Sequence, residues 1–303
     1  MRAELSGLLR HESARDDLPA VGDWVAFRRE VGDHAIVHAV LPRSSALRRG
    51  LAGGTTEAQI VAANVDFVLL VMALDGDLNP RRLERYLTVV CSSGAEAIVV
   101  LTKADAAVQS DGFVAEVRAV TRSPVIVTSS VTGDGIADVR ALFEGHRTGV
   151  LVGSSGVGKS TLANALLEAP VLATGATDGD GRGRHTTTSR ELVLLSTGGI
   201  LIDTPGMREL RLFGDEADLA QSFDDVAALA LECRFRDCAH EDEPDCGVRG
   251  SLDEERYRSY HKLRRELATV AVRKDARALS EQKRNMKVLL RAHRERNKTR
   301  GRS

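Results

Sequence analysis

The spacing of apolar residues along the chain changes near residue 65. In the first 60 residues, apolar and polar positions alternate in short segments such as 23–28 and 35–41, and Val-Gly-Asp turns at 21–23 and 31–33 punctuate them. Alternation with a period of two between turn residues is typical of short β-strands. Several such strands in so few residues predict a small β-barrel.

From residue 65 onward, compact apolar runs alternate with segments of helical periodicity. The predicted strands cover residues 65–73, 96–101, 125–128, 149–152, 192–195 and 200–203, and the predicted helices cover 80–93, 112–121, 135–143 and 160–167. This alternation predicts an α/β domain with a doubly wound parallel sheet. Ligands bind at the carboxyl ends of the strands in such a fold, so the polar residues that follow the strands are candidates for function.

The chain becomes helical after about residue 216 and ends in a basic segment. These changes divide it into four predicted parts. They are a β-barrel over 1–60, the α/β domain over 61–215, a helical module over 216–262 and a basic helical tail over 263–303.

A glycine-rich loop follows the predicted strand at 149–152. Its residues fit Gly-x-x-x-x-Gly-Lys-Ser/Thr without a gap: Gly153, Ser154, Ser155, Gly156, Val157, Gly158, Lys159 and Ser160. Glycines let consecutive backbone N–H groups approach a phosphate at the start of a helix. Lys159 supplies charge for the β- and γ-phosphates, and the Ser160 hydroxyl is a ligand for Mg²⁺. Thr161 completes the predicted nucleotide-binding segment.

Two further elements end other predicted strands. An Asp-x-x-Gly element begins at Asp203 and ends at Gly206. Its carboxylate is expected to hold Mg²⁺ through water, and Gly206 to donate its N–H to the γ-phosphate. Thr102, Lys103 and Asp105 form a Thr-Lys-x-Asp element, and Asp105 can accept two hydrogen bonds that guanine offers and adenine does not. This base-reading element precedes the phosphate loop, whereas ordinary GTPases have the reverse order. The chain therefore resembles a circularly permuted GTPase.

Two positions depart from the usual GTPase pattern. GTPases usually carry Asn where this chain has Thr102, so the contact to guanine N7 is expected to be weaker or to be remade by the Thr hydroxyl. Met207 stands where Ras-like enzymes carry the Gln that orients the attacking water. A thioether cannot orient water, so either hydrolysis is slow until a partner helps or another residue positions the water.

Composition indicates an ordinary globular protein. Of the 303 residues, 43% are hydrophobic and 28% are charged, and this length allows about two domains with small extra modules. The longest apolar runs, 68–74 and 97–101, are strand-sized, well below the roughly 20 residues of a membrane span. The N-terminus lacks the basic-then-apolar pattern of a signal peptide. We therefore expect a cytoplasmic protein with no membrane span.

The formal net charge of -1 hides an asymmetry between the body and the tail. Residues 262–303 contain 15 Lys or Arg and 4 Asp or Glu, a balance of +11, so the rest of the chain carries -12. A basic tail on an acidic body points to an anionic partner, although a solvated charge run is the usual explanation of such a tail. Apolar residues at helical spacing favour an amphipathic basic helix; they are Leu279, Met286, Leu289 and Leu290.

Three of the four cysteines cluster with a histidine in a polar, loop-like segment. The candidate ligands are Cys233, Cys238, His240 and Cys246. Three thiolates and one imidazole form a closed tetrahedral zinc site, and a site with no open position is structural rather than catalytic. We expect one structural Zn²⁺ here.

The combination of these motifs resembles one family. A permuted GTPase between an N-terminal β-barrel and a Cys-x₄-Cys-x-His-x₅-Cys module is similar to the ribosome-small-subunit-dependent GTPase A family (RsgA, also written YjeQ). The matching segments include 59–66, 82–87, the phosphate loop, 183–188, 203–206 and the cysteine cluster. The resemblance implies an OB-fold barrel, GTP hydrolysis stimulated by the small ribosomal subunit, binding of rRNA and a role in late maturation of that subunit. A monomer that uses GTP or GDP, Mg²⁺ and one Zn²⁺ is expected.

The resemblance also suggests roles for the segment 175–190, where a first switch belongs. It favours Thr187 as the residue that meets Mg²⁺ and the γ-phosphate. His185 is the candidate to position water in place of the missing Gln; alternatively it packs or touches RNA phosphate. Ser129 and Ser130 resemble the Ser-Ala element that contacts guanine through its backbone.

Other interpretations remain open at this point. Trp24 is expected in the barrel core rather than as a stacking platform for RNA bases. Thr102 and Met207 also suit an RNA-binding assembly placeholder with a degenerate nucleotide site. A permuted GTPase that acts on the large ribosomal subunit is a further alternative, against which the zinc cluster and the barrel argue.

Overall fold

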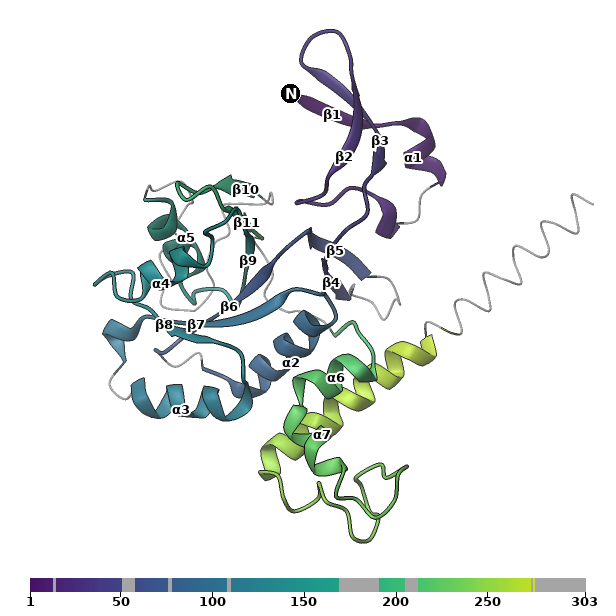
Figure 1. The fold of residues 1–303 in the computed structure, drawn as a ribbon, viewed down its shortest axis with the longest axis vertical. Helices are drawn as coiled ribbons and strands as arrows, with labels where there is room; N and C mark the ends of the chain where they lie inside the picture. Colours follow the sequence, from purple (N-terminus) through teal and green to yellow (C-terminus); the bar gives the residue numbers. More distant parts are fainter. Residues whose placement is uncertain are drawn as a thin grey trace, which may run out of the picture.

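The computed structural model describes residues 1–12, 15–50, 58–75, 78–107, 110–168, 191–204, 212–273 and 275. At its centre lies a six-stranded sheet in the order β10-β11-β9-β6-β7-β8 (Figure 1). Its strands are β6 (Phe67–Ala73), β7 (Glu96–Thr102), β8 (Val125–Val127), β9 (Thr148–Val152), β10 (Glu191–Leu194) and β11 (Ile200–Asp203). Every neighbouring pair is parallel except β10 with β11. The predicted α/β sheet is confirmed.

Helices cover both faces of this sheet. They are α2 (Pro80–Cys91), α3 (Ser110–Val120), α4 (Ile136–Ala141) and α5 (Lys159–Leu167), with a short 3-10 helix η2 at Ala104–Ala106. Alternate residues of β6 divide between two buried clusters: Leu70 packs with α2 and α3, and Leu69 packs with α4 and α5. Because β6 is buried on both faces, it is apolar throughout.

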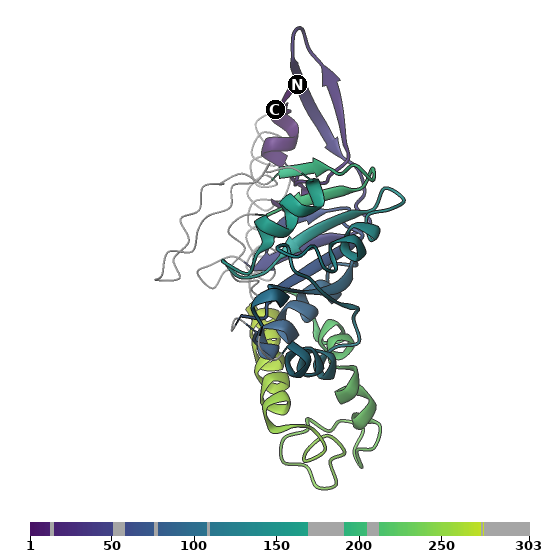
Figure 2. The same cartoon turned by 90° about the vertical axis from the view of Figure 1, so that its left-hand side faces the viewer.

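The N-terminal strands form two separate sheets among the described residues. One contains β1 (Arg2–Leu5), β3 (His34–Val40) and β2 (Val25–Arg29), next to α1 (Gly7–Glu12) and a 3-10 helix, Arg15–Asp17. The other pairs β4 (Ala46–Gly50) with β5 (Ala58–Ala63). The first sheet projects away from the central sheet (Figures 1 and 2), whereas Leu47 and Val61 join the core of the α/β domain. The predicted boundary between residues 60 and 61 therefore falls inside β5, and the closed barrel stays a prediction.

The expectation for Trp24 is wrong. Its side chain is 66% exposed, and Phe27 in the following strand is 50% exposed. The strand β2 lies at the edge of a small sheet, and the residues of β2 after Val25 are all exposed. Alternation of apolar and polar residues predicts a strand, but here it does not identify a buried face.

The chain after residue 212 forms a helical module that packs against α2. Its elements are α6 (Glu216–Ser222), α7 (Asp224–Ala230) and a helix over 254–273. Phe223, Val226, Tyr260 and Leu263 form part of its own apolar cluster. Among the residues that the structure describes, no helix is both long and apolar enough to cross a membrane.

Candidate functional site

The predicted nucleotide-binding residues gather at one edge of the central sheet. The phosphate loop follows β9, Asp203 ends β11, the element from Thr102 to Asp105 begins at the last residue of β7, and Ser129 comes two residues after β8. These strands are parallel and adjacent in the order β11-β9-β6-β7-β8. Parallel strands present their carboxyl ends at the same edge, so residues far apart in the sequence meet there.

The phosphate loop has the backbone that its glycines predict. Gly156 and Gly158 have φ of 82° and 90°, in the left-handed region that favours glycine. A Cβ on Gly153 would lie 2.3 Å from the Val71 carbonyl oxygen. The Lys159 ammonium donates to the backbone oxygens of Gly153 at 2.8 Å and Ser154 at 2.5 Å. It therefore lies along the loop, where a phosphate would offer it stronger acceptors.

The Thr102 side chain forms hydrogen bonds with the protein backbone. Its hydroxyl donates to the Val157 carbonyl oxygen in the phosphate loop at 2.6 Å, and the Met72 oxygen lies 3.2 Å away. The residue is buried. The hydroxyl thus joins β7 to the phosphate loop. This favours the expectation that the contact to guanine N7 is weaker over the expectation that the Thr hydroxyl remakes it.

The carboxylate of Asp105 is held by a serine of the neighbouring strand end. Ser129 donates its hydroxyl proton to Asp105 Oδ1 at 2.5 Å, and the same Ser129 oxygen accepts from the backbone N–H groups of Val131 and Thr132 at 3.2 and 3.1 Å. Ser129 is buried and Ser130 is half-buried. The Ser129 side chain therefore orients Asp105, and the contact of its backbone with guanine stays a prediction.

Asp203 is a buried carboxylate beside the phosphate loop. Burial raises its pKa above the ordinary value, and the positive charge of Lys159 partly opposes that shift. A buried carboxylate gains most when a cation shares its environment. Ser160 lies in the first turn of α5, so Ser160 and Asp203 fit the requirement for oxygen ligands to Mg²⁺.

Three predicted site residues lie outside the described part of the chain. They are His185, Thr187 and Gly206. The structure therefore describes the base-reading element, the phosphate loop and Asp203, and the roles of the switch residues stay predictions.

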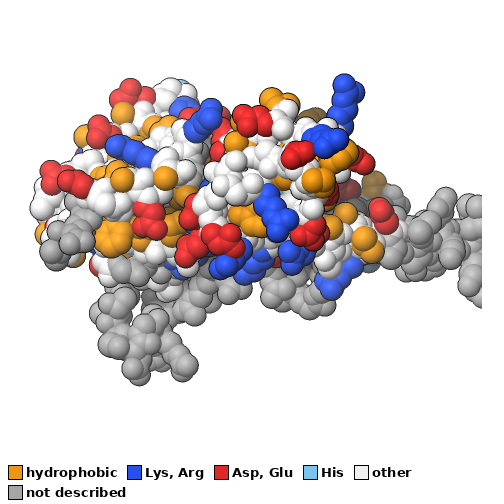
Figure 3. Space-filling model, turned by 90° about the horizontal axis from the view of Figure 1, so that it is seen from below, with side chains coloured by type: hydrophobic (Ala, Val, Ile, Leu, Met, Phe, Trp, Pro, Cys, Tyr) orange, Lys and Arg blue, Asp and Glu red, His pale blue; other side chains and the backbone are white. Residues whose placement is uncertain are grey.

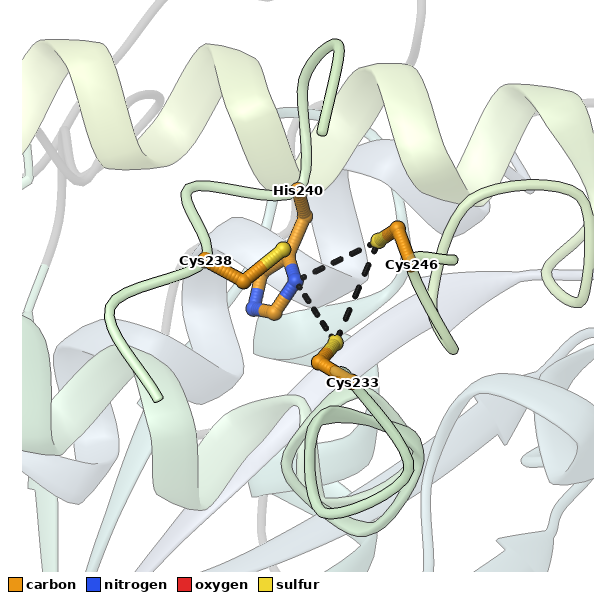
Figure 4. A group of neighbouring side chains, drawn as sticks. All are labelled: Cys233, Cys238, His240 and Cys246. Atoms are coloured by element: carbon orange, nitrogen blue, oxygen red, sulfur yellow. Dashed lines mark hydrogen bonds between the residues drawn. The ribbon is translucent and has the colours of Figure 1, made fainter. Parts of the chain in front are cut away.

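The cysteine cluster has the geometry of a tetrahedral metal site (Figure 4). The ligand atoms of Cys233, Cys238, His240 and Cys246 all lie within 4.8 Å of one another. The His240 Nδ1 atom is 3.5 Å from Cys233 Sγ and 3.6 Å from Cys246 Sγ, and these two sulfurs are 3.9 Å apart. Zinc bonds of about 2.3 Å to sulfur and 2.0–2.1 Å to nitrogen place tetrahedral ligands about 3.8 Å and 3.5 Å apart. The donor set therefore fits Zn²⁺.

The loop that carries these ligands is held by polar contacts beyond the cluster. Burial lowers the pKa of the His240 imidazole, which favours the neutral form that binds metal. The His240 carbonyl oxygen accepts from the Tyr257 hydroxyl at 2.6 Å. Glu243 accepts from the backbone N–H groups of Ala239 and Glu241, both at 2.9 Å, and such bonds lower its pKa to about 2.

Sequence patterns did not predict several of these contacts. Asp75 pairs with Lys103, Tyr257 supports the metal loop, and Arg256 joins the module to Glu84 of α2. One signal was available: Asp75 is an acidic residue just after an apolar strand, and Asp203 is an acidic residue at the end of another. The long-range partners carry no comparable local signal.

Comparison with known proteins agrees with this geometry. A family model described as RsgA GTPase matches residues 40–213, and one described as 50S ribosome-binding GTPase matches residues 148–296. A protein named small ribosomal subunit biogenesis GTPase RsgA 1 from Oceanobacillus iheyensis is 45% identical over 297 residues, which cover 95% of this chain and 85% of the relative. Its counterpart from Opitutus terrae is 48% identical over 294 residues, covering 90% and 79%.

Two solved structures are also similar. YjeQ from Thermotoga maritima has a TM-score of 0.64 at 28% identity, covering 88% of this chain and 89% of that one. YloQ, described as a circularly permuted GTPase, has a TM-score of 0.60 at 24% identity, covering 88% and 85%, and this second likeness concerns the fold alone. The permuted order predicted from the sequence is confirmed.

Proposed function

The chain belongs to the RsgA GTPase family, and from that membership we propose that it hydrolyses GTP on the small ribosomal subunit during late maturation of that subunit. The observation that carries this proposal is that Lys159, Asp105 and Asp203 follow or end strands whose carboxyl ends lie at the same edge of the sheet. One site thereby offers a phosphate cradle, a guanine acceptor and a carboxylate for Mg²⁺. The relatives that cover nearly the whole chain are named for the small subunit, and this supports the choice of partner.

Each site residue has a proposed part in the reaction. Lys159 moves its ammonium from the loop carbonyls to the β- and γ-phosphates and neutralises charge that develops there. Asp105, oriented by Ser129, accepts the guanine N–H groups. Ser160 and Asp203, with Thr187, would hold Mg²⁺, which would offset the negative charge of the phosphates.

Hydrolysis breaks the bond between the γ-phosphorus and the oxygen that bridges to the β-phosphate. A water oxygen forms the new bond, and its proton passes to the phosphate product. We propose that His185 orients this water, because Met207 cannot. Hydrolysis is then slow for the free protein and faster when the subunit arranges His185 and Thr187 around the phosphates.

Binding to rRNA is assigned mainly to the basic tail. The excess of +11 lies within residues 262–303, whereas the face drawn in Figure 3 intersperses acidic and basic side chains among its described residues. Lys and Arg on phosphates release counterions, so affinity falls steeply with salt. A monomer that works in the cytoplasm completes the proposal.

One observation favours a second candidate, a GTPase that acts on the large subunit. The model described as 50S ribosome-binding GTPase matches residues 148–296. That match omits the base-reading element at 102–105 and the N-terminal strands, whereas two relatives named for the small subunit cover 95% of this chain. We therefore rank the small subunit first.

Sedimentation with separated subunits tests the choice. The protein is loaded with GDP or with a non-hydrolysable GTP analogue and centrifuged with each subunit, and turnover is measured with and without subunits. We expect binding to the small subunit with the GTP analogue, together with stimulated turnover. Stimulation by the large subunit alone would favour the second candidate. Absence of turnover under all conditions would favour a degenerate nucleotide site.

The tail is tested separately by removing the residues after Lys274. Its loss should weaken subunit binding and flatten the salt dependence, while turnover of the free protein stays near that of the wild type. His185→Ala should have the opposite effect and lose stimulation while binding persists. If the truncated chain binds as tightly as the full chain, the tail is a solvated charge run and does not bind the subunit.

A further inference from the structure

Lys103 of the base-reading element forms a close ion pair with Asp75. Lys103 Nζ lies 2.6 Å from Asp75 Oδ2, and both side chains are about one-third exposed, at 34% and 35%. We propose that Asp75 is a positioning residue of the guanine site, which anchors the Lys103 ammonium so that the lysine side chain lies against the bound base. This inference rests on the proposed nucleotide-binding function and adds a residue that the motifs do not contain.

The sheet itself brings the two residues together. Ala73 and Thr102 are register partners in the parallel pair β6–β7. One residue further along, the Leu74 N–H donates to the Thr102 carbonyl oxygen at 3.0 Å and extends the ladder. Asp75 follows Leu74 and Lys103 follows Thr102, so the pairing of the two strands brings Asp75 and Lys103 close together.

The backbone of Lys103 restricts its side chain further. Lys103 has φ of 59° and ψ of 39°, a left-handed conformation that is unfavourable for a residue with a Cβ. Neighbouring bonds hold it there: the Thr102 hydroxyl is bound to Val157 O, and the Ala106 N–H donates to the Lys103 carbonyl oxygen at 3.1 Å. A strained backbone that its surroundings maintain is a common feature of binding sites. Here it gives the lysine stem a defined starting direction, and Asp75 fixes the far end.

The place of Asp75 explains why it needs a cation. The strand order β11-β9-β6-β7-β8 puts the end of β6 between the phosphate loop of β9 and the base-reading element of β7. An unpaired carboxylate at that position would repel the phosphates of a nucleotide. Asp105 accepts a hydrogen bond from Ser129. Among the described residues, the ammonium that pairs with Asp75 is that of Lys103. The pair is neutral, and Asp75 can therefore position Lys103 without opposing the nucleotide.

This arrangement predicts different effects on ligands with and without a base. In Asp75→Asn, the lysine stem loses its anchor and must be ordered when the base binds, so GDP should bind more weakly. For an exposed pair the loss should be about two- to fivefold. Magnesium pyrophosphate has no base to contact, and the variant has one negative charge fewer near the phosphates. Asp75→Asn should therefore bind magnesium pyrophosphate as tightly as the wild type does, or more tightly.

The experiment measures dissociation constants with the full-length, zinc-loaded protein. A fluorescent GDP analogue is titrated, and pyrophosphate is measured by competition, for the wild type, Asp75→Asn, Asp75→Glu, Lys103→Ala and the double variant Asp75→Asn/Lys103→Ala. Asp75→Glu keeps the carboxylate and should recover part of the lost GDP affinity. The double variant should bind GDP no more weakly than Lys103→Ala, because removing Lys103 alone leaves the repelling carboxylate.

A matched control separates charge from position. Glu144→Gln removes one negative charge at the turn before β9, at the opposite edge of the sheet, and should leave both affinities unchanged. GDP binding by Asp75→Asn that equals that of the wild type would overturn the proposal. An equal loss for GDP and pyrophosphate would also overturn it, since that pattern indicates damage to the phosphate loop. Failure of the wild type to bind GDP would instead refute the proposed function.

Discussion

Replacing Arg256 with Met tests how the zinc-bearing module is held on the GTPase domain. The guanidinium is 7% exposed, donates to Glu84 of α2 at 2.8 Å and makes two bonds to Asp225 of α7, at 2.5 and 2.7 Å. Burial alone would lower the pKa of Arg256, but the two carboxylates raise it overall. Arg256 therefore stays charged, and it connects two segments that are 172 residues apart in the sequence.

The size of the effect follows from the burial of Glu84. Its side chain has no exposed surface, and breaking a buried ion pair by removing one partner costs about 3–5 kcal/mol. Arg81 still donates to Glu84 in the variant, which places the expected loss near the lower end, at about 3 kcal/mol. Glu84 Oε2 has no hydrogen-bond partner among the described residues, so the second carboxylate oxygen already lacks compensation.

Hydrogen exchange of the helix over 254–273 measures this loss. A protein with several domains has no single two-state free energy of unfolding, whereas exchange reports the opening of one region. A loss of about 3 kcal/mol corresponds to exchange faster on the order of 100-fold. The matched control is Arg258→Met on the same helix. Arg258 pairs with Glu254 at 2.8 Å, both side chains are largely exposed, and such pairs contribute at most about 1 kcal/mol.

Similar exchange rates in Arg256→Met and Arg258→Met would refute the assignment. A double variant checks the cause. Glu84→Leu combined with Arg256→Met removes both principal charges, and replacing a buried pair by apolar residues of similar size is often close to neutral. The double variant should therefore exchange more slowly than Arg256→Met alone, which identifies the unpaired Glu84 charge as the source of instability.

Further predictions concern the two ligand sites. Lys159→Ala should abolish subunit-stimulated turnover while far-ultraviolet circular dichroism stays unchanged, and normal turnover would remove the phosphate loop from the mechanism. Asp105→Asn should lose about 1.5–3 kcal/mol of GTP affinity in titrations and shift preference towards xanthine nucleotides; unchanged GTP affinity would refute its role as base reader. Because the raised pKa of Asp203 makes its ionised form unfavourable in the nucleotide-free fold, Asp203→Asn should raise Tm at neutral pH without nucleotide and weaken Mg²⁺-dependent GTP binding. Glu243→Gln should release zinc to a chelator faster than the control Asp242→Asn, because an amide cannot accept both backbone bonds that Glu243 accepts; equal release rates would contradict this.

The sequence by itself determined the chemical elements and their order. The phosphate loop, the Thr-Lys-x-Asp element and the set of zinc ligands each lie within a short segment. Their spacing can therefore be recognised without knowledge of the fold. Apolar runs of strand length then placed Asp105, Ser129 and Asp203 near strand ends, and parallel strands bring such ends to one edge. The metal cluster needed only four ligands, three Cys and one His, within 14 residues from 233 to 246.

The tertiary structure alone decided which side chains meet across the sheet and between the parts. The Thr102 hydroxyl turns to Val157, 55 residues away, because the order of strands puts the phosphate loop within its reach. Trp24 is exposed because the small sheet that follows it leaves the residues of β2 after Val25 uncovered. Glu84 is buried in α2 because Arg256 covers it from a distant helix. Hydrophobic periodicity reports which positions favour burial, but the partner that a polar residue finds depends on contacts that only the complete fold creates.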